Sequence, residues 1–283
     1  MLLFVAVVLA TEPAITPKIF PTPEAAVDAL VDGLTHHDDN ELHVVLGQDY
    51  RRLMPLDAVS EEDRTNFLAA WAQGHHIERN DVNARLVLSN GWTLPIPIVR
   101  SGEGWIFDVR AGEEEIRIRR IGRNELAAIQ VMYAYYDAQR EYAEQDRNGV
   151  GILEYASRFL SSPGKHDGLY WATADGAPPS PAGPLFNTHD IKDGYYGYRF
   201  KILEAQGPAA SGGARSYLSR GHLTNGFALV AWPARYGETG VMSFLVNHDG
   251  VVYQKNLGAA SAALASAMTR FNPDATWVAL PPP

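Results

Sequence analysis

The sequence predicts an α+β protein in two parts. N-terminal helices with an antiparallel meander come first, and a long helix packed on an antiparallel sheet follows. Three observations support this: apolar residues at helical spacing near the N-terminus, strand-like runs separated by turn residues, and a tyrosine-rich helical stretch over residues 122–151 that precedes more strand patterns. A chain of 283 residues is long enough for two such cores.

Composition restricts the classes of partner. The net charge of -9 argues against nucleic acid, which requires a basic surface, and against docking on anionic lipid. The chain contains no cysteine, which excludes disulfides, thiol catalysis and Cys-type zinc sites.

The N-terminus has features of an export signal. Leu2–Ala10 is an uncharged apolar run, too short to span a bilayer as a helix. Val8-Leu9-Ala10 places small residues where a signal peptidase would cut, although no Lys or Arg precedes the run. We therefore expect residues 1–17 to be a signal peptide and lead, and the location to be periplasmic or extracellular. No later segment has transmembrane length, so we expect no stable membrane insertion.

The first domain is expected over residues 18–112. A helix begins at Pro23, a favoured first helical residue, with Thr22 as its N-cap. Turn residues then separate period-two runs, which is typical of a meander. The expected elements are a helix from Pro23, a second helix capped by Asp39 or Asn40, a third over about Glu61–His75, and then strands Ala84–Leu88, Thr93–Val99 and Trp105–Val109. This order of elements resembles the cone-shaped folds of the nuclear-transport-factor and cystatin-like group.

The second domain is expected over residues 113–283. Glu113–Glu115 place acids at the positive end of a helix dipole, which indicates a helix start. The expected apolar face of this helix comprises Leu126, Ile129, Tyr133 and Tyr136. The elements expected after it are a short helix Leu153–Leu160, a loop Ser161–Pro184, strands Tyr195–Ala205, Leu223–Ala231, Val241–Val246 and Val251–Gln254 with an Asp249-Gly250 turn, and a helix Ala259–Phe271.

Two resemblances to known families extend this prediction of the fold. The first is carried by Arg120–Gln130, Asp137–Ala143, Arg158–Trp171, Gly194–Leu203 and Gly226–Gly258. In these segments the chain resembles an uncharacterised bacterial family of secreted proteins, domain of unknown function 2950. The resemblance implies an envelope location and no assigned activity.

The second resemblance covers Asn124–Gln254. A long helix, a loop, a Gly-Tyr-x-Phe-type strand, the Tyr-Gly-x-x-Gly run Tyr236–Gly240 and the strand with its turn Phe244–Gly250 follow in order. That order resembles the globular heads of type IV pilins and pseudopilins. Pilins have an apolar membrane stem before the helix, whereas Arg117–Arg123 is charged here. The resemblance therefore implies a pilin-like fold without assembly into a pilus.

One turn resembles a metal loop. Calcium loops place oxygen ligands at alternating positions, and Asp146, Asn148 and Glu154 fit positions one, three and nine. Val150 and Ser157 stand where further side-chain ligands are expected. Calcium is thus the one cofactor that the sequence leaves open, against the plainer interpretation of a glycine C-cap with an Asx-turn.

Two further patterns are interpreted as structural. The histidine groups at 36–43 and 75–76 could offer zinc ligands, but adjacent helical residues point apart, which favours a polar helix junction. Ser162 and Lys165 match the Ser-x-x-Lys pair of acyl-enzymes. Pro163-Gly164 lies between them, so we expect a loop rather than the helical turn which that chemistry needs.

The candidate binding residues lie in the following loop. Aromatic and polar side chains can line a glycan or peptide groove, and Tyr170, Trp171, Lys165 and Asp167 have this character. The plainer interpretation is that the aromatics pack the long helix on the sheet.

The sequence favours a non-enzymatic binding or envelope-assembly role, with an unknown envelope protein or ligand as partner. One alternative is a periplasmic hydrolase with a site between the domains that uses Asp146, Lys165, Asp167 or Tyr170. The other is a calcium-stabilised structural module. The pattern assigns no catalytic residue.

Overall fold

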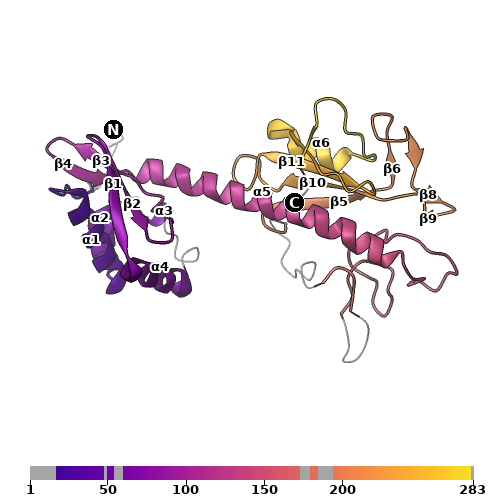
Figure 1. Ribbon diagram of the computed structural model, residues 1–283, viewed down its shortest axis with the longest axis horizontal. Helices are drawn as coiled ribbons and strands as arrows, with labels where there is room; N and C mark the ends of the chain where they lie inside the picture. Colours follow the sequence, from indigo (N-terminus) through magenta and orange to yellow (C-terminus); the bar gives the residue numbers. More distant parts are fainter. Residues whose placement is uncertain (1–16, 48–49, 54–59, 173–178, 184–193, 282–283) are drawn as a thin grey trace, which may run out of the picture. The chain divides into compact units, whose positions relative to one another are not determined.

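The computed structural model describes residues 17–47, 50–53, 60–172, 179–183 and 194–281. The chain divides into two compact units, Met1–Ile118 and Arg119–Pro283, here called unit 1 and unit 2. Figure 1 shows helices together with sheets in the chain, and all strand pairings in the sheets are antiparallel. This combination confirms the predicted α+β class. The expected signal peptide lies outside the described residues, apart from Pro17 of its lead.

Unit 1 combines helices with a four-stranded sheet in the order β1-β2-β3-β4. Because strands adjacent in the chain are adjacent in the sheet, the sheet is a meander. Its elements are α1 (Pro23–Thr35), α2 (Asp39–Leu46), α3 (Tyr50–Leu53), α4 (Glu61–Gln73), β1 (His75–Arg79), β2 (Asn83–Leu88), β3 (Ile98–Ser101) and β4 (Gly104–Phe107). They share one apolar core, which includes Leu30, Leu46, Leu86, Ile98 and Phe107.

Side-chain caps fix where the first helices begin. Thr22 Oγ1 accepts the N–H of Ala25 at 3.1 Å, which confirms its predicted role as N-cap of α1. The cap of α2 is Asp38, whose carboxylate accepts the N–H of Asn40 at 2.9 Å. The prediction of Asp39 or Asn40 as that cap is therefore wrong by one or two residues.

Two predicted boundaries in unit 1 are also wrong. The third long helix, α4, ends at Gln73, and His75 instead begins strand β1. The side chains of β1 are mostly exposed, so no apolar alternation marked it as a strand. The strand predicted over Thr93–Val99 begins only at Ile98, because the two prolines before it have no N–H to donate to a neighbouring strand.

Helix α5 (Val109–Tyr142) is 34 residues long and passes from unit 1 into unit 2. Asp108 accepts the N–H of Ala111 at 3.0 Å, so the helix begins before the predicted start at Glu113. Residues 112 and 113, where we expected one domain to end and the next to begin, lie inside this helix. None of the helices in the described part of the chain is long and apolar enough to cross a membrane.

The buried face of α5 agrees only in part with the predicted face, of which Ile129, Tyr133 and Tyr136 are partly buried and pack against the core. Leu126, expected on the apolar side, is 65% exposed. The buried residues are Ala128, Val131, Met132, Tyr135, Ala138, Gln139 and Tyr142. The predicted residues and the buried residues both recur at helical spacing. The buried set includes the polar residue Gln139, so it was not recognised as an apolar face. Its amide is satisfied in the core, where it accepts the N–H of Ala156 and donates to the carbonyl of Ala156, each at 2.8 Å.

Unit 2 contains a five-stranded sheet in the order β13-β12-β11-β10-β5. All residues of the inner strand β10 are buried. Leu229 packs in the core that includes α5, and Val230 packs in a second core that includes α6. The sheet therefore lies between α5 and α6. The elements are β5 (Tyr198–Leu203), β10 (Ala228–Pro233), β11 (Met242–Asn247), β12 (Tyr253–Asn256), β13 (Val278–Ala279), η2 (Gly258–Ala260), α6 (Ser261–Ala267), and the hairpins β6 (Ala205–Gln206) with β7 (Arg215–Ser216) and β8 (Leu218–Ser219) with β9 (His222–Leu223).

The helix predicted over Leu153–Leu160 is wrong. The N–H of Tyr155 donates to the carbonyl of Leu223, and the N–H of Tyr170 donates to the carbonyl of Phe159, each at 2.8 Å. These backbone groups therefore bond to distant segments, and the segment stays irregular.

The last predicted elements have shifted bounds. The strand expected over Leu223–Ala231 is β10, which begins at Ala228, and the final helix ends at Ala267. The Asp-Gly turn is confirmed: Gly250 has φ 76° and donates its N–H to Asn247 at 2.9 Å.

Candidate functional site

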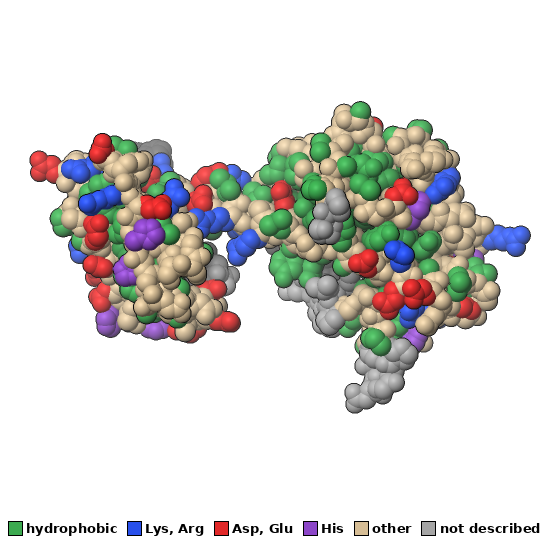
Figure 2. Space-filling model, in the orientation of Figure 1, with side chains coloured by type: hydrophobic (Ala, Val, Ile, Leu, Met, Phe, Trp, Pro, Cys, Tyr) green, Lys and Arg blue, Asp and Glu red, His purple; other side chains and the backbone are tan. Residues whose placement is uncertain are grey.

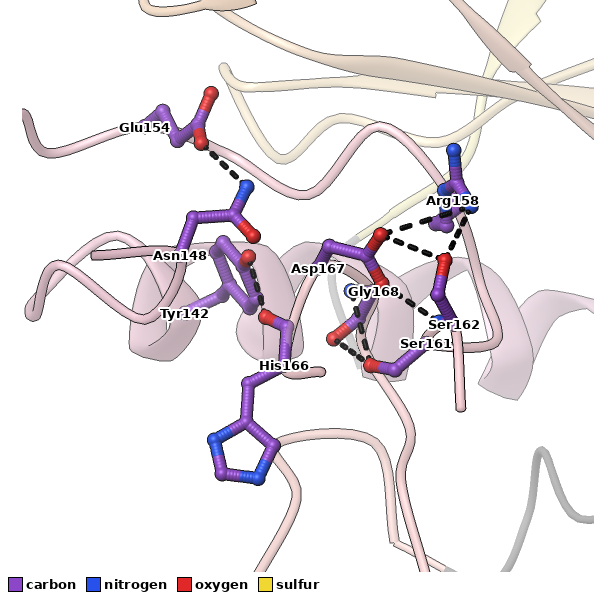
Figure 3. Close-up of polar contacts among 9 residues, drawn as sticks. All are labelled: Tyr142, Asn148, Glu154, Arg158, Ser161, Ser162, His166, Asp167 and Gly168. Carbon is purple, nitrogen blue, oxygen red and sulfur yellow. Dashed lines mark hydrogen bonds and ion pairs between the residues drawn. The ribbon is translucent and has the colours of Figure 1, made fainter. Parts of the chain in front are cut away.

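The candidate site is the irregular segment that follows α5, residues 143–172, here called the post-helix loop. It contains every metal and binding residue expected from the sequence. Figure 3 shows polar contacts within this loop, together with the hydrogen bond from Tyr142 that joins it to the end of α5. Each contact comes from a side chain in the loop or from Tyr142 in the last turn of the helix.

Asp146 closes the tight turn at the start of this loop. Its Oδ1 accepts the N–H of Val150 at 3.0 Å, and its Oδ2 accepts the N–H of Gly151 at 2.8 Å. Gly149 and Gly151 have φ values of 67° and 80°, a backbone region that glycine adopts without strain. Both carboxylate oxygens of Asp146 thus stabilise the loop itself.

Glu154 is a buried carboxylate, with 8% of the residue exposed. Its Oε1 accepts Nδ2–H of Asn148 at 2.8 Å, and its Oε2 accepts from Nδ1 of His222 at 2.8 Å. His222 belongs to hairpin β8–β9, and the neighbouring backbone bond from Tyr155 to Leu223 joins the same two segments. Glu154 therefore fastens the post-helix loop to the hairpin.

The three expected metal ligands are engaged in this way with groups of the protein. In the part of the chain that the structure describes, no three His, Asp or Glu side chains are grouped so as to hold a metal ion. The calcium assignment to Asp146, Asn148 and Glu154 stays a prediction.

Asp167 accepts a second set of hydrogen bonds that hold the loop together. Ser162 donates to it twice, from its N–H to Oδ1 at 2.6 Å and from its hydroxyl to Oδ2 at 2.8 Å. Arg158 donates to the same hydroxyl at 2.9 Å and lies 3.6 Å from Oδ2. Burial alone would raise the pKa of Asp167, but the bonds from Ser162 and the charge of Arg158 outweigh it and lower that pKa. The carboxylate is therefore held ionised.

The Ser-x-x-Lys segment is a loop, as predicted. Lys165 donates its backbone N–H to the carbonyl of Ser162 at 2.9 Å, which is a turn rather than a helix. The hydroxyl of Ser162 is engaged by Asp167 and Arg158, and the Lys165 side chain is exposed.

Trp171 anchors the far end of the loop. It is 8% exposed, and the ring of His166 stacks on it with centroids 4.3 Å apart. The guanidinium carbon of Arg147 lies 5.6 Å from its ring, a cation–π geometry. Tyr142 donates its hydroxyl to the carbonyl of His166 at 2.7 Å, and burial raises the pKa of Tyr142 to about 12. Tyr170 is half-buried, with its N–H in the backbone bond to Phe159.

Sequence reasoning missed two features of this site. His222, the partner of Glu154, lies 68 residues away in the chain, and no local pattern marked it. Val150, Ile152 and Leu153 are 49%, 38% and 59% exposed. Only Val150, which lies between Gly149 and Gly151, carried a sequence signal of an irregular segment, whereas Leu153 fits the spacing of a helix.

The fold and the site define a two-unit α+β protein whose second unit carries a tightly fastened loop. The chain matches the family described as protein of unknown function (DUF2950) over residues 17–280. It therefore belongs to this family, for which that description gives no activity. No curated protein and no solved structure matches the chain.

Proposed function

We propose that this protein is a non-enzymatic binding protein of the cell envelope, and that a partner protein docks on its post-helix loop. The observation that carries the proposal is the exposure of Val150, Ile152 and Leu153 on a loop that its own contacts hold in place. Adjacent exposed apolar side chains are typical of interaction surfaces.

The fastening of the loop supports this role. Asp146 and Glu154 bracket the three apolar residues and are both engaged in hydrogen bonds. The backbone between them is therefore constrained, so the apolar side chains remain at the surface. A surface that is ordered before binding loses less conformational entropy when a partner docks.

The residues beside the exposed apolar patch of Val150, Ile152 and Leu153 indicate the kind of partner. Glu141, Glu144 and Asp146 are exposed just before it in the chain. An apolar centre with a polar rim is the usual arrangement of a protein interface. We therefore propose a partner with an apolar pocket whose rim carries Lys or Arg.

The hydrolase alternative would use Asp146 or Asp167 as an acid or base. Both carboxylates accept hydrogen bonds from groups of their own loop. This use of their oxygens favours the binding role.

The docking surface can be tested with a photo-crosslinking amino acid at position 153 of the full chain in its native cell. The matched control is position 264, because Leu264 is also an exposed leucine of unit 2 but lies on α6. We expect an adduct of one defined mass at 153 that Val150→Ser weakens, and none at 264. Equal adducts at both positions, or none at 153, would contradict docking.

Two further measurements address the remaining parts of the proposal. Fractionation should find the protein in the envelope or medium with its apolar run Leu2–Ala10 removed; an uncleaved cytoplasmic protein would contradict export.

Purified protein should not turn over broad hydrolase substrates. Turnover that Asp167→Asn abolishes would support the hydrolase instead.

A further inference from the structure

Two adjoining hollows in unit 1 are lined by arginines. One has a volume of about 570 Å³ and is lined by Arg79, Asn80 and Arg100 with Trp105. The other, of about 450 Å³, is lined by Arg79, Asn80 and Arg85. Because both include Arg79 and Asn80, they adjoin. We propose that they form a binding site for an anionic ligand that carries several carboxylate or phosphate groups.

Because acidic residues outnumber basic ones in unit 1, a cluster of three arginines around the two hollows is unusual. Residues 1–118 contain 19 Asp and Glu but only 9 Lys and Arg, and side chains of both charges lie on the face of unit 1 that Figure 2 shows. Three of those 9 line the two hollows. Neighbouring cations repel one another, and arginine is the side chain best suited to bind carboxylate or phosphate with two parallel hydrogen bonds. The cluster is therefore better explained by a ligand than by the overall charge.

Arg100 is held in place for this role. Its guanidinium carbon lies 5.4 Å from the ring centroid of Trp105, which is itself 5% exposed. Its Nε donates to the carbonyl of Gly102 at the long distance of 3.4 Å. Within the described residues its terminal nitrogens have no further partner, so they are available to a ligand.

The other donors of the hollows are only weakly engaged. Arg79 lies 3.4 Å from Glu24, with both side chains more than half exposed, and such pairs contribute little. Arg85 has no ion-pair partner among the described residues. The Oδ1 of Asn80 accepts the N–H groups of Val82 and Asn83, which leaves its NH₂ group free to donate.

Two carboxylates among the lining residues, besides the Glu24 that pairs with Arg79, oppose an anion in this site. Asp81 lines the larger hollow and Glu78 the smaller. Glu78 lies 3.7 Å from His76, whereas Asp81 has no such partner in the described part of the chain. Removal of the Asp81 charge should therefore tighten the binding of an anion, which a purely structural role of the arginines would not produce.

The test is calorimetric titration of the full-length protein with two probes, trigalacturonate for carboxylates and inorganic tripolyphosphate for phosphates. We expect one of them to bind, and the one that binds identifies the chemistry of the ligand. Arg79→Gln and Arg100→Gln should each weaken the binding about tenfold. Arg110→Gln is the control, because this exposed arginine of unit 1 lines neither hollow and should leave the affinity unchanged.

Asp81→Asn should strengthen the binding about two- to fivefold, and higher salt should weaken it for every variant. Arg100→Gln removes a packing contact with Trp105 as well as a charge. Arg85→Gln therefore serves as a second variant that removes a charge without that contact, and it should also weaken binding. The proposal is overturned if neither probe binds, if Arg110→Gln weakens binding as much as Arg100→Gln, or if Asp81→Asn weakens it.

Discussion

Glu154 accepts a hydrogen bond from Nδ1 of His222 at 2.8 Å. A carboxylate can only accept, so Nδ1 carries the proton. The Glu154 side chain is 9% exposed and that of His222 35%, which places the carboxylate inside and the imidazole at the edge. This pair, with Asn148 on the other carboxylate oxygen, holds the post-helix loop on hairpin β8–β9.

Substitution of Glu154 should therefore destabilise unit 2. In Glu154→Gln, the new NH₂ group would face a donor from either Asn148 or His222, so one buried hydrogen bond would be lost. We expect a loss of about 1–3 kcal/mol in the free energy of unfolding, measured with urea. The exposed Glu144 provides the control, and Glu144→Gln should change stability little. Equal effects of both variants would show that Glu154 is not a fastening.

Asn148 offers a direct test of the calcium interpretation. Because Asp146 already accepts two backbone N–H groups, we expect the Tm of the natural protein to be the same in calcium and in EDTA. Asn148→Asp should lower the Tm in EDTA, since two carboxylates would then face each other. It should also create a rise of Tm with calcium. A calcium-dependent Tm in the natural protein would instead support the metal module.

His248 should make stability depend on pH in the acid range. Burial lowers its pKa; the charge of Arg215 on β7 adds to this, and Asp249 in the same turn opposes it. Arg215 lies 2.7 Å from its Nε2, and the rings of Tyr217 and Phe227 pack against it. The folded protein therefore favours neutral His248.

Because the folded pKa of His248 lies below the unfolded value of about 6.5, its contribution is fully present above that pH. It is lost as the pH falls toward the folded pKa. Urea unfolding at pH 7.5 and pH 5.0 should show this loss, and His248→Gln should reduce it. The exposed His76 is the control; if His76→Gln reduced the loss equally, His248 would not be its source.

Tyr142 and Tyr217 should resist ionisation at alkaline pH, since burial raises the pKa of each to about 12. The stability that depends on their neutral form is present below pH 10 and is lost as the pH rises from there through 12. Absorbance titration of the folded protein should show a late-ionising fraction that disappears in urea. Tyr142→Phe should reduce that fraction, and no reduction in this variant would contradict the burial argument.

Several elements were predictable because their chemistry is local. Thr22 at the start of α1 and Gly250 in the turn before β12 act on groups within three residues of themselves. The long run of helix formers predicted α5, and the strand patterns predicted most strands of the two larger sheets, although β1 and β13 were missed and most bounds shifted. The loop nature of Ser162–Lys165 followed from its proline and glycine.

The wrong predictions of a helix over Leu153–Leu160 and of a buried Leu126 have a common cause. Leu153 and Leu160 fit a helix by spacing, but bonds to Leu223 and Tyr170 drew the backbone of their segment elsewhere. Leu126 fits the helical period as well as Met132 does, yet only Met132 meets the sheet. Period alone does not say where the sheet lies.

The sequence by itself determined the α+β class, the cap of α1, the Asp-Gly turn before β12 and the acidic charge of unit 1. Each of these depends on residue type or on hydrogen bonds between near neighbours. Only the tertiary structure decided which face of α5 is buried, that Glu154 bonds to His222, and that Arg79, Arg85 and Arg100 line adjoining hollows. These relationships join residues far apart in the chain, and burial and electrostatic pairing depend on distance in space rather than on distance along the sequence.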